Sequence, residues 1–141
     1  MKHLVRILSL TLVLTLLSLT LLACGKPAKD PADAKAALEE AGYVVSKDDR
    51  ILPATFTGFG YSLTSVVSGS KISKDDAGNT VIDHVTVYYF KDKDAATKAM
   101  DKVKEYEATD KNDGDQSNWV APTQSGAMIY YGTKAAVKAA K

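Results

Sequence analysis

The sequence is poor in the side chains that build disulfide frameworks and metal sites. Its 141 residues include one cysteine, Cys24, and two histidines, His3 and His84. A single cysteine supplies neither a disulfide scaffold nor a cysteine zinc site. Acidic and basic residues nearly balance, with a formal net charge of +1, and the basic residues are dispersed along the chain. This distribution argues against a groove that follows nucleic-acid phosphates and against a polybasic lipid-binding patch.

The sequence also lacks a glycine-rich loop that could cradle a phosphate. Gly58 and Gly60 precede a predicted strand rather than a helix, which is the wrong context for such a loop. The residues after position 23 make one ordinary domain, and so short a chain cannot supply two lobes that close on a solute. A phosphate-loop protein and a two-lobed solute receptor are therefore disfavoured.

The N-terminal segment has the pattern of a secretory signal. Lys2 and Arg6 precede an uncharged, leucine-rich run over Ile7–Leu22, and Ala23 is the small residue that signal cleavage favours. The run closes with Leu21-Leu22-Ala23-Cys24. These four residues resemble the lipobox of bacterial lipoprotein precursors, in which a leucine is followed by two small or aliphatic residues and an invariant cysteine.

The resemblance implies that Cys24 receives a diacylglyceryl thioether and that the chain is cleaved before it. The partner would then be the membrane, reached through the lipid, and the protein would lie on the extracytoplasmic side of a bacterial cell membrane or envelope. No cofactor is expected beyond the covalent diacylglycerol and an N-acyl group on Cys24. The expected parts are a signal peptide over 1–23, a lipidated tether over 24–29 and one domain over 30–141.

Two other interpretations of this segment are open. Ile7–Ala23 is about long enough to cross a hydrocarbon core of roughly 30 Å uncleaved, but serine and threonine interrupt it and no basic stop-transfer cluster follows. Cys24 could instead be a buried core cysteine, although the loop-forming residues Gly25–Lys29 argue against its burial. We expect cleavage and lipidation.

Three segments carry the start signals and the apolar spacing of helices. Asp30, Asp92 and Thr133 each suit the N-cap position, and apolar residues follow at intervals of three and four. Gly42 supplies a stop signal after the first segment. The sequence therefore predicts helices over Pro31–Ala41, Lys93–Glu107 and Lys134–Ala140.

Two segments in the middle of the chain predict a long antiparallel hairpin. From Phe59 onward the apolar residues Tyr61, Leu63 and Val67 share one face, so this strand should have one core face and one polar face. Asp75–Asn79 supplies the turn to a second strand, Thr80–Phe90. The remaining expected features are strands over Tyr43–Val45, Trp119–Ala121 and Ala127–Tyr131, turns over Ser46–Asp49 and Pro122–Gly126, and a loop over Thr109–Asn118.

The order of these elements predicts a single small α+β domain. We expect an antiparallel or mixed sheet of about five strands, with two to three helices packed mainly on one face. The second face would be semi-polar and open unless a partner or the last helix covers it.

His84 and an acidic loop are the residues that could carry chemistry. His84 shares a strand face with Thr86 and Tyr88, but no local serine, histidine and aspartate spacing identifies a catalytic partner. We expect a partly exposed strand histidine, with a pH-dependent contact as the alternative. Asp110–Asp115 resembles the start of a calcium loop, yet Asp115 and Ala121 stand where glycine and glutamate are required. A solvated acidic loop without a metal ligand is expected there.

Aromatic residues on predicted strands form the candidate binding face. Exposed tyrosine and tryptophan are enriched at binding hot spots, whereas buried rings supply much of a small domain's core. Both interpretations are open for these rings. The candidate face consists of Tyr88, Phe90, Tyr130, Tyr131 and Trp119.

These observations favour a non-enzymatic binding or assembly module whose partner is another envelope protein or a cell-wall component. One alternative is a small hydrolase or metal-dependent enzyme, with a site assembled from Asp83, His84 and Asp110–Asp115. Another is a structural envelope lipoprotein in which the domain is a spacer.

Overall fold

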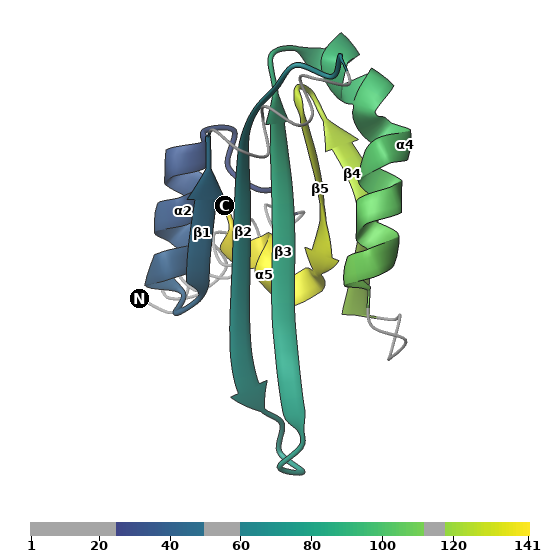
Figure 1. Ribbon diagram of the computed structural model, residues 1–141. Coiled ribbons are helices and arrows are strands. Elements are labelled where there is room, and N and C mark those ends of the chain that lie inside the picture. The colour runs from purple at the N-terminus through teal and green to yellow at the C-terminus, as the bar shows by residue number, and fades with distance from the viewer. Residues whose placement is uncertain (1–24, 50–59, 112–117) are drawn as a thin grey trace, which may run out of the picture.

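The computed structural model describes residues 25–49, 60–111 and 118–141. The four residues that resemble a lipobox and the rest of the expected signal peptide therefore lie outside the described residues. The elements follow one another along the chain as Figure 1 shows: α2 (Pro31–Glu40), β1 (Val44–Asp48), β2 (Leu63–Lys74), β3 (Thr80–Phe90), α4 (Lys93–Asp110), β4 (Trp119–Ser125), β5 (Met128–Thr133) and α5 (Lys134–Ala139).

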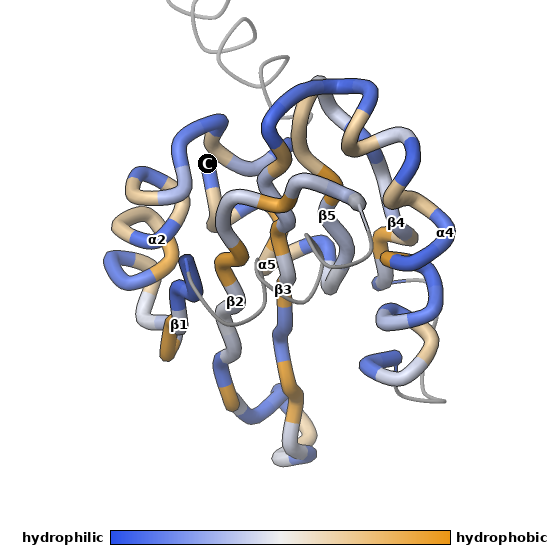
Figure 2. The backbone as a smooth tube through the Cα atoms, turned by 45° about the horizontal axis from the view of Figure 1, so that its top comes forward, coloured by the Kyte–Doolittle hydropathy of each residue, from blue (hydrophilic) through white to orange (hydrophobic). Residues whose placement is uncertain are grey.

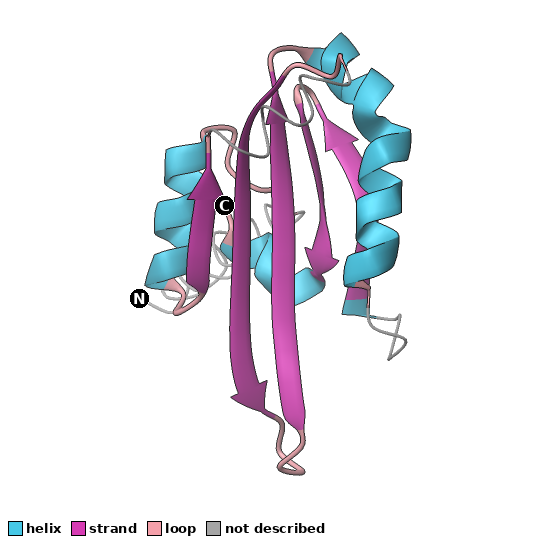
Figure 3. Cartoon of the chain, viewed as in Figure 1, coloured by secondary structure: helices cyan, strands magenta, loops and turns pink. Residues whose placement is uncertain are grey.

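The five described strands form one sheet in the order β1-β2-β3-β5-β4, and every neighbouring pair is antiparallel. With the three described helices, this confirms the predicted small α+β domain. The expected long hairpin is present as β2 and β3, and it extends well beyond the shorter strands (Figure 3). Its turn forms as predicted, because Asp75 accepts hydrogen bonds from the N–H groups of Ala77 and Asn79 and Gly78 adopts a φ of 83°.

Each of the three described helices begins at its predicted cap. The side chains of Asp30, Asp92 and Thr133 accept hydrogen bonds from backbone N–H groups two or three residues further on. At its other end, α4 runs one turn beyond the predicted boundary at Glu107, to Asp110. The predicted start of the loop at Thr109 is thus wrong, and the extra turn carries Asp110 over the sheet.

Apolar side chains gather in two clusters, one on each face of the sheet. Successive residues of β3 alternate between them, with Val87 and Tyr89 in one cluster and Tyr88 and Phe90 in the other. Helices α2 and α5 cover the first face, and α4 covers the second (Figure 1). Two of the three helices thus share one face, as predicted. The expectation that the second face stays open is wrong where α4 lies.

The first cluster defines the α2/α5 face and the second the α4 face. Buried members of the first are Ala34, Leu38, Tyr43, Val67, Val85, Val87, Tyr89, Met128, Tyr130, Ala136, Val137 and Ala140. Buried members of the second are Leu63, Val66, Tyr88, Phe90, Ala95, Ala96, Ala99, Val103, Ile129 and Tyr131.

Burial on both faces changes the predicted pattern of β2. Val66 and Val67 are both buried, on opposite faces, so the expected division into one core face and one polar face is wrong. A register shift between Leu63 and Ser65 also places Leu63 on the face of Val66 rather than that of Val67. A strand covered on both sides does not show simple alternation.

The two edge strands are longer than predicted. Ser46–Asp48, expected as a turn, pairs with β2 and completes β1. Pro122 lies inside β4, at a register shift between Val120 and Thr123, rather than in the turn. Proline has no backbone N–H to donate. An edge strand tolerates it at a position where the N–H of another residue would face solvent and would need no partner strand. The turn between β4 and β5 is correspondingly shorter and centres on Gly126, with a φ of 61°.

Candidate functional site

None of the helices that the structure describes lies over one part of the α4 face. Directly opposed residues of antiparallel strands project to the same face, so the register places Val44, Ser70 and His84 side by side. The next such row along the hairpin pairs Ile72 with Ile82. We call this surface the open face and define it as Val44, Ser46, Ser68, Ser70, Ile72, Ile82 and His84.

The open face exposes apolar side chains that the described fold leaves in solvent. Val44 is 79% exposed, Ile72 is 74% exposed and Ile82 is 50% exposed. Figure 2 shows hydrophobic segments near the free end of the β2–β3 hairpin, away from the helices. Neighbouring exposed apolar groups beside polar ones are typical of interaction surfaces.

A pocket of about 300 Å³ lies where the open face meets α4. A second hollow, of about 200 Å³, adjoins it along β1 and β2 and shares Ser68 and His84 with it. The two hollows therefore form one depression centred on His84. The larger one is lined by Val66, Ser68, His84, Thr86, Tyr88, Tyr106 and Asp110.

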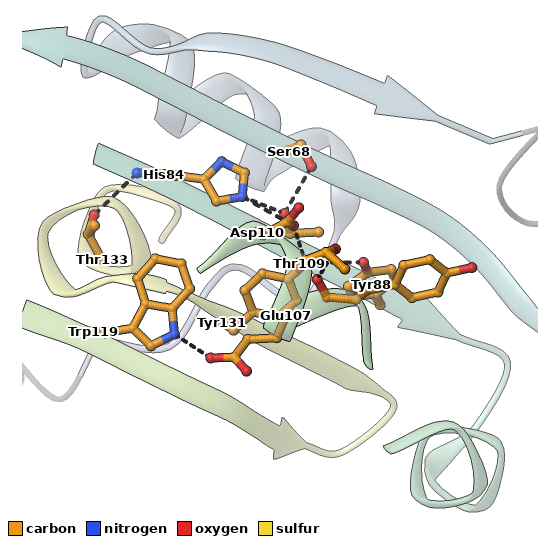
Figure 4. A network of polar contacts seen from close by, with 11 residues as sticks. Ser68, His84, Tyr88, Glu107, Thr109, Asp110, Trp119, Tyr131 and Thr133 are labelled. Atoms are coloured by element: carbon orange, nitrogen blue, oxygen red, sulfur yellow. Dashed lines mark hydrogen bonds and ion pairs between the residues drawn. The ribbon is translucent and has the colours of Figure 1, made fainter. Parts of the chain in front are cut away.

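Polar side chains in the pocket are linked to one another (Figure 4). The hydroxyl oxygens of Ser68 and Thr86 lie 3.1 Å apart, and the Thr86 hydroxyl lies 3.0 Å from His84 Nε2. Asp110 Oδ2 approaches the same nitrogen at 3.8 Å. These side chains come from β2, β3 and the last turn of α4. The pocket therefore forms only when α4 packs on the sheet.

Two tyrosine hydroxyl groups form a chain of contacts that ends at Asp110. The Tyr131 hydroxyl donates a hydrogen bond to Asp110 Oδ2 at 2.5 Å, and the Tyr88 hydroxyl lies 3.4 Å from that of Tyr131. Burial raises the pKa of Tyr88 to about 12 and raises the pKa of Tyr131 as well. Both phenols therefore keep their protons at neutral pH, and Tyr131 donates to the carboxylate.

Burial lowers the pKa of His84 below its usual value, and the nearby Asp110 carboxylate opposes that shift. Because the burial effect is the larger, the imidazole is mainly neutral at pH 7. A neutral imidazole offers one donor and one acceptor nitrogen. The backbone N–H of His84 is held separately, by the Thr133 hydroxyl at 3.3 Å.

Tyr131 is also the centre of an aromatic group beneath the pocket. Its ring centroid lies 6.1 Å from those of Tyr88 and Trp119 and 6.4 Å from that of His84. Trp119 Nε1 donates to Glu107 Oε1 at 2.7 Å, which satisfies a carboxylate that is 8% exposed. Among the described residues, no buried side-chain nitrogen or oxygen lacks a hydrogen-bond partner. The buried polar groups around the pocket are thus paired within the protein.

The predicted aromatic binding face is wrong as an exposed patch. Tyr88, Phe90, Tyr130 and Tyr131 are each 7% exposed or less, and Trp119 is half-buried. Tyr130 moreover lies in the cluster of the α2/α5 face, while the other three lie with Trp119 on the α4 face. The alternative, that these rings build the core, is the one that the structure bears out.

The residues considered for chemistry are only partly brought together. His84 and Asp110 meet in the pocket, whereas the Asp83 carboxylate accepts a hydrogen bond from the Thr133 hydroxyl at 2.9 Å, outside the pocket lining. Of the acidic loop Asp110–Asp115, residues from 112 onward lie outside the described residues. No group of histidine, cysteine or acidic side chains that could hold a metal occurs in the described part of the chain.

Sequence reasoning missed Ser68, Thr86 and Tyr106 as pocket residues. The alternation of β3 does place Thr86 on the face of His84, and that signal could have suggested their contact. Nothing local could have placed Ser68 and Tyr106 there, because they arrive from β2 and α4 through the sheet register and helix docking.

Over the stretches that the structure describes, no helix has the length and apolar character needed to cross a membrane. Comparison of the chain with protein-family models, with curated proteins and with solved structures gives no match in any of the three.

Proposed function

We propose that this protein is a lipid-anchored extracytoplasmic lipoprotein of the bacterial envelope that acts as a non-enzymatic binding or assembly module. The open face and its pocket form the binding surface. One observation carries the proposal. The polar depression around His84 lies on the same sheet face as the exposed side chains of Val44, Ile72 and Ile82.

The chemistry of this surface suits a ligand with both polar and apolar groups. Hydrogen-bond donors and acceptors come from Ser68, Ser70 and the imidazole of His84. Burying the three exposed apolar side chains against a ligand would contribute favourable free energy, because apolar surface is removed from water. Since the polar groups are already linked to one another, little ordering is needed on binding. Another envelope protein or a cell-wall component fits these requirements.

The anchor is supported by the N-terminal pattern that ends in Leu21-Leu22-Ala23-Cys24. Each methylene that enters the bilayer contributes about 0.8 kcal/mol, so one acyl chain holds a protein marginally and two hold it stably. A diacylglyceryl group on Cys24 would therefore keep the domain on its membrane.

The anchor is tested by replacing its sulfur. Cys24→Ser should abolish the acyl mass on the processed chain, leave the precursor uncleaved or released, and shift the protein from the particulate fraction. Mass spectrometry of the N-terminal peptide and membrane fractionation measure these effects. A variant that stays equally particulate and migrates unchanged contradicts the proposed lipidation.

The binding surface is tested by photo-crosslinking on intact cells. A photoreactive amino acid at Ser70, on the open face, should give discrete adducts with a neighbour, identified by mass spectrometry. The matched control is Asp101, 95% exposed on the outer side of α4. Adducts that form only from position 101, or equally from both positions, would show that the open face is not the binding surface. If neither position gives adducts, the result favours the alternative of a structural lipoprotein whose domain is a spacer.

The pairing of His84 with Asp110 favours one second candidate, a hydrolase. In a serine-type arrangement, however, the histidine uses one nitrogen for the carboxylate and the other for the nucleophile. Here Asp110 and Thr86 both approach Nε2. Hydrolysis of an envelope-derived ester or amide that is lost in His84→Gln would favour the hydrolase over the binding module.

A further inference from the structure

The expected tether is held against the domain rather than free. The backbone N–H of Ala28 donates to the carbonyl of Ala140 at 2.7 Å, and the Tyr89 hydroxyl donates to the carbonyl of Ala28 at 2.9 Å. Gly25 lies so close to α5 that a methyl group there would come within 3.2 Å of Lys138 Cα, and within 2.8 Å of Cε of Lys141, just after the helix. The described part of the tether, residues 25–29, therefore has a fixed position.

This position is on the side of the sheet away from the open face. Ala28 packs against the cluster of the α2/α5 face, and Gly25 lies beside Lys138 at the end of α5. In Figure 1 the C-terminal end of the chain lies behind β2, on the side of α2 and α5. A lipid carried by the residue before Gly25 would thus emerge on the α2/α5 side.

Lysines from both ends of the domain gather around this exit point. Lys26, Lys29, Lys138 and Lys141 are all exposed, and none of them forms an ion pair within the described residues. Lys26 and Lys29 also border a pocket of about 490 Å³ whose lining includes Tyr89. The carboxylates of Asp30 and Asp33, which act on Tyr89, also lie on this side of the domain.

The sequence pattern argues against a polybasic patch because the lysines are dispersed along the chain, but the fold brings residues 26, 29, 138 and 141 to one side of the domain. We infer that these four lysines form a contact surface for anionic phospholipid headgroups. A lysine close to an anionic membrane surface is attracted to it, and the attraction adds to that of an acyl anchor. The lipid and the lysines together would turn the α2/α5 side toward the bilayer and the open face away from it. This inference rests on the proposed lipidation of Cys24.

The test uses the lipidated protein in vesicles, after mass spectrometry has verified the lipid on Cys24. With that sulfur occupied, the chain has no other cysteine, so Ala135→Cys on α5 and Ser70→Cys on the open face can each carry one nitroxide label. Paramagnetic resonance compares their access to oxygen, which enters lipid, and to a water-soluble nickel complex. Vesicles contain phosphatidylcholine with or without phosphatidylglycerol.

On phosphatidylglycerol vesicles we expect the label at residue 135 to be more accessible to oxygen and less accessible to nickel than the label at residue 70. Lys138→Glu with Lys141→Glu should reduce that difference. Lys74→Glu with Lys98→Glu makes the same charge change at exposed lysines elsewhere and should leave the difference intact. Circular dichroism checks that every variant folds.

Two results would overturn the inference. One is a label at residue 70 that is as close to lipid as the label at residue 135, or closer. The other is an equal response to the two double variants, or no response to either. An unmodified Cys24 would reject the proposed lipidation itself, and this inference with it, whereas a lipidated Cys24 with equal labels would reject the inference alone.

Discussion

The two faces of the sheet differ in what they bury. The α2/α5 face buries a continuous apolar cluster, with Leu38 and Val85 fully enclosed. The α4 face combines a second apolar cluster with linked polar groups, among them His84, Thr86 and Asp110. One face therefore serves mainly to stabilise the domain, while the other also arranges polar side chains at its border with solvent.

The boundary between these roles runs through a single strand. Val85, Val87 and Tyr89 of β3 project to the α2/α5 face, and His84, Thr86 and Tyr88 project to the other. A substitution at Val85 should therefore act mainly on stability, whereas one at the neighbouring His84 should act mainly on the pocket. Five substitution experiments compare the two faces, in decreasing order of the change expected.

The largest effect should come from Gly132→Ala, which disturbs both faces at once. Gly132 has a φ of 144°, and a methyl group there would lie 2.1 Å from the His84 carbonyl oxygen, inside the β3–β5 pairing. We expect a loss of about 4 kcal/mol or more in the free energy of unfolding, measured with urea. Gly126→Ala is the control, because Gly126 also has a positive φ but faces open space, and it should cost only about 1 to 2 kcal/mol. Equal losses would contradict the steric explanation.

The next largest effect should separate the apolar cluster from the open face. Leu38 is fully buried and its Cδ1 packs over Gly69, so Leu38→Ala should lower the free energy of unfolding by about 2 to 5 kcal/mol. Ile72→Ala, on the open face, should change it by less than about 0.5 kcal/mol yet reduce crosslinking from position 70. Urea unfolding and the crosslink yield measure the two effects. A stability loss in Ile72→Ala as large as that in Leu38→Ala would mean that the open face is core.

A smaller effect is expected from Tyr131→Phe, which removes a hydroxyl from the polar side of the α4 face. The variant loses the donor to Asp110, a hydrogen bond worth about 1 kcal/mol given that the carboxylate is partly exposed. Combining it with Asp110→Asn in a double-mutant cycle should give a coupling free energy of similar size. Strictly additive losses would show that the bond contributes nothing.

The smallest effect is a pH dependence from His84. Burial lowers the pKa of His84 in the folded protein, while the unfolded chain has the ordinary value of about 6.5. The unfolded chain therefore takes up the proton first, so stability is complete above about pH 6.5 and declines as the pH falls through that value toward the folded pKa. His84→Gln should lack this decline when unfolding is measured across the range.

Asp110→Asn sharpens the same measurement. The carboxylate raises the pKa of His84 against the effect of burial, so its removal should move the histidine titration to still lower pH, followed by proton resonances of the imidazole. A titration that moves upward, or stays in place, would mean that the two groups do not interact.

Much of the fold could be predicted from the sequence because its signals are local. The caps at Asp30, Asp92 and Thr133 and the turn at Asp75–Asn79 depend on groups within a few residues, and each forms as expected. The predicted turn at Ser46–Asp49 failed because its polar residues find their hydrogen bonds in β2, far along the chain. The aromatic face failed for a related reason, since nothing local says that α4 will cover Tyr88 and Tyr131.

Local signals are enough to predict the helix starts, the long hairpin and the α+β class, because each follows from spacing and capping along a short stretch. The proposed anchor depends on Leu21-Leu22-Ala23-Cys24, the four residues that resemble a lipobox. Tertiary packing places α4 on the face opposite α2 and α5, brings Asp110 to His84, and lays Gly25 beside Lys138. These contacts join residues far apart in the chain, and their geometry is fixed by packing and sheet register rather than by local preference.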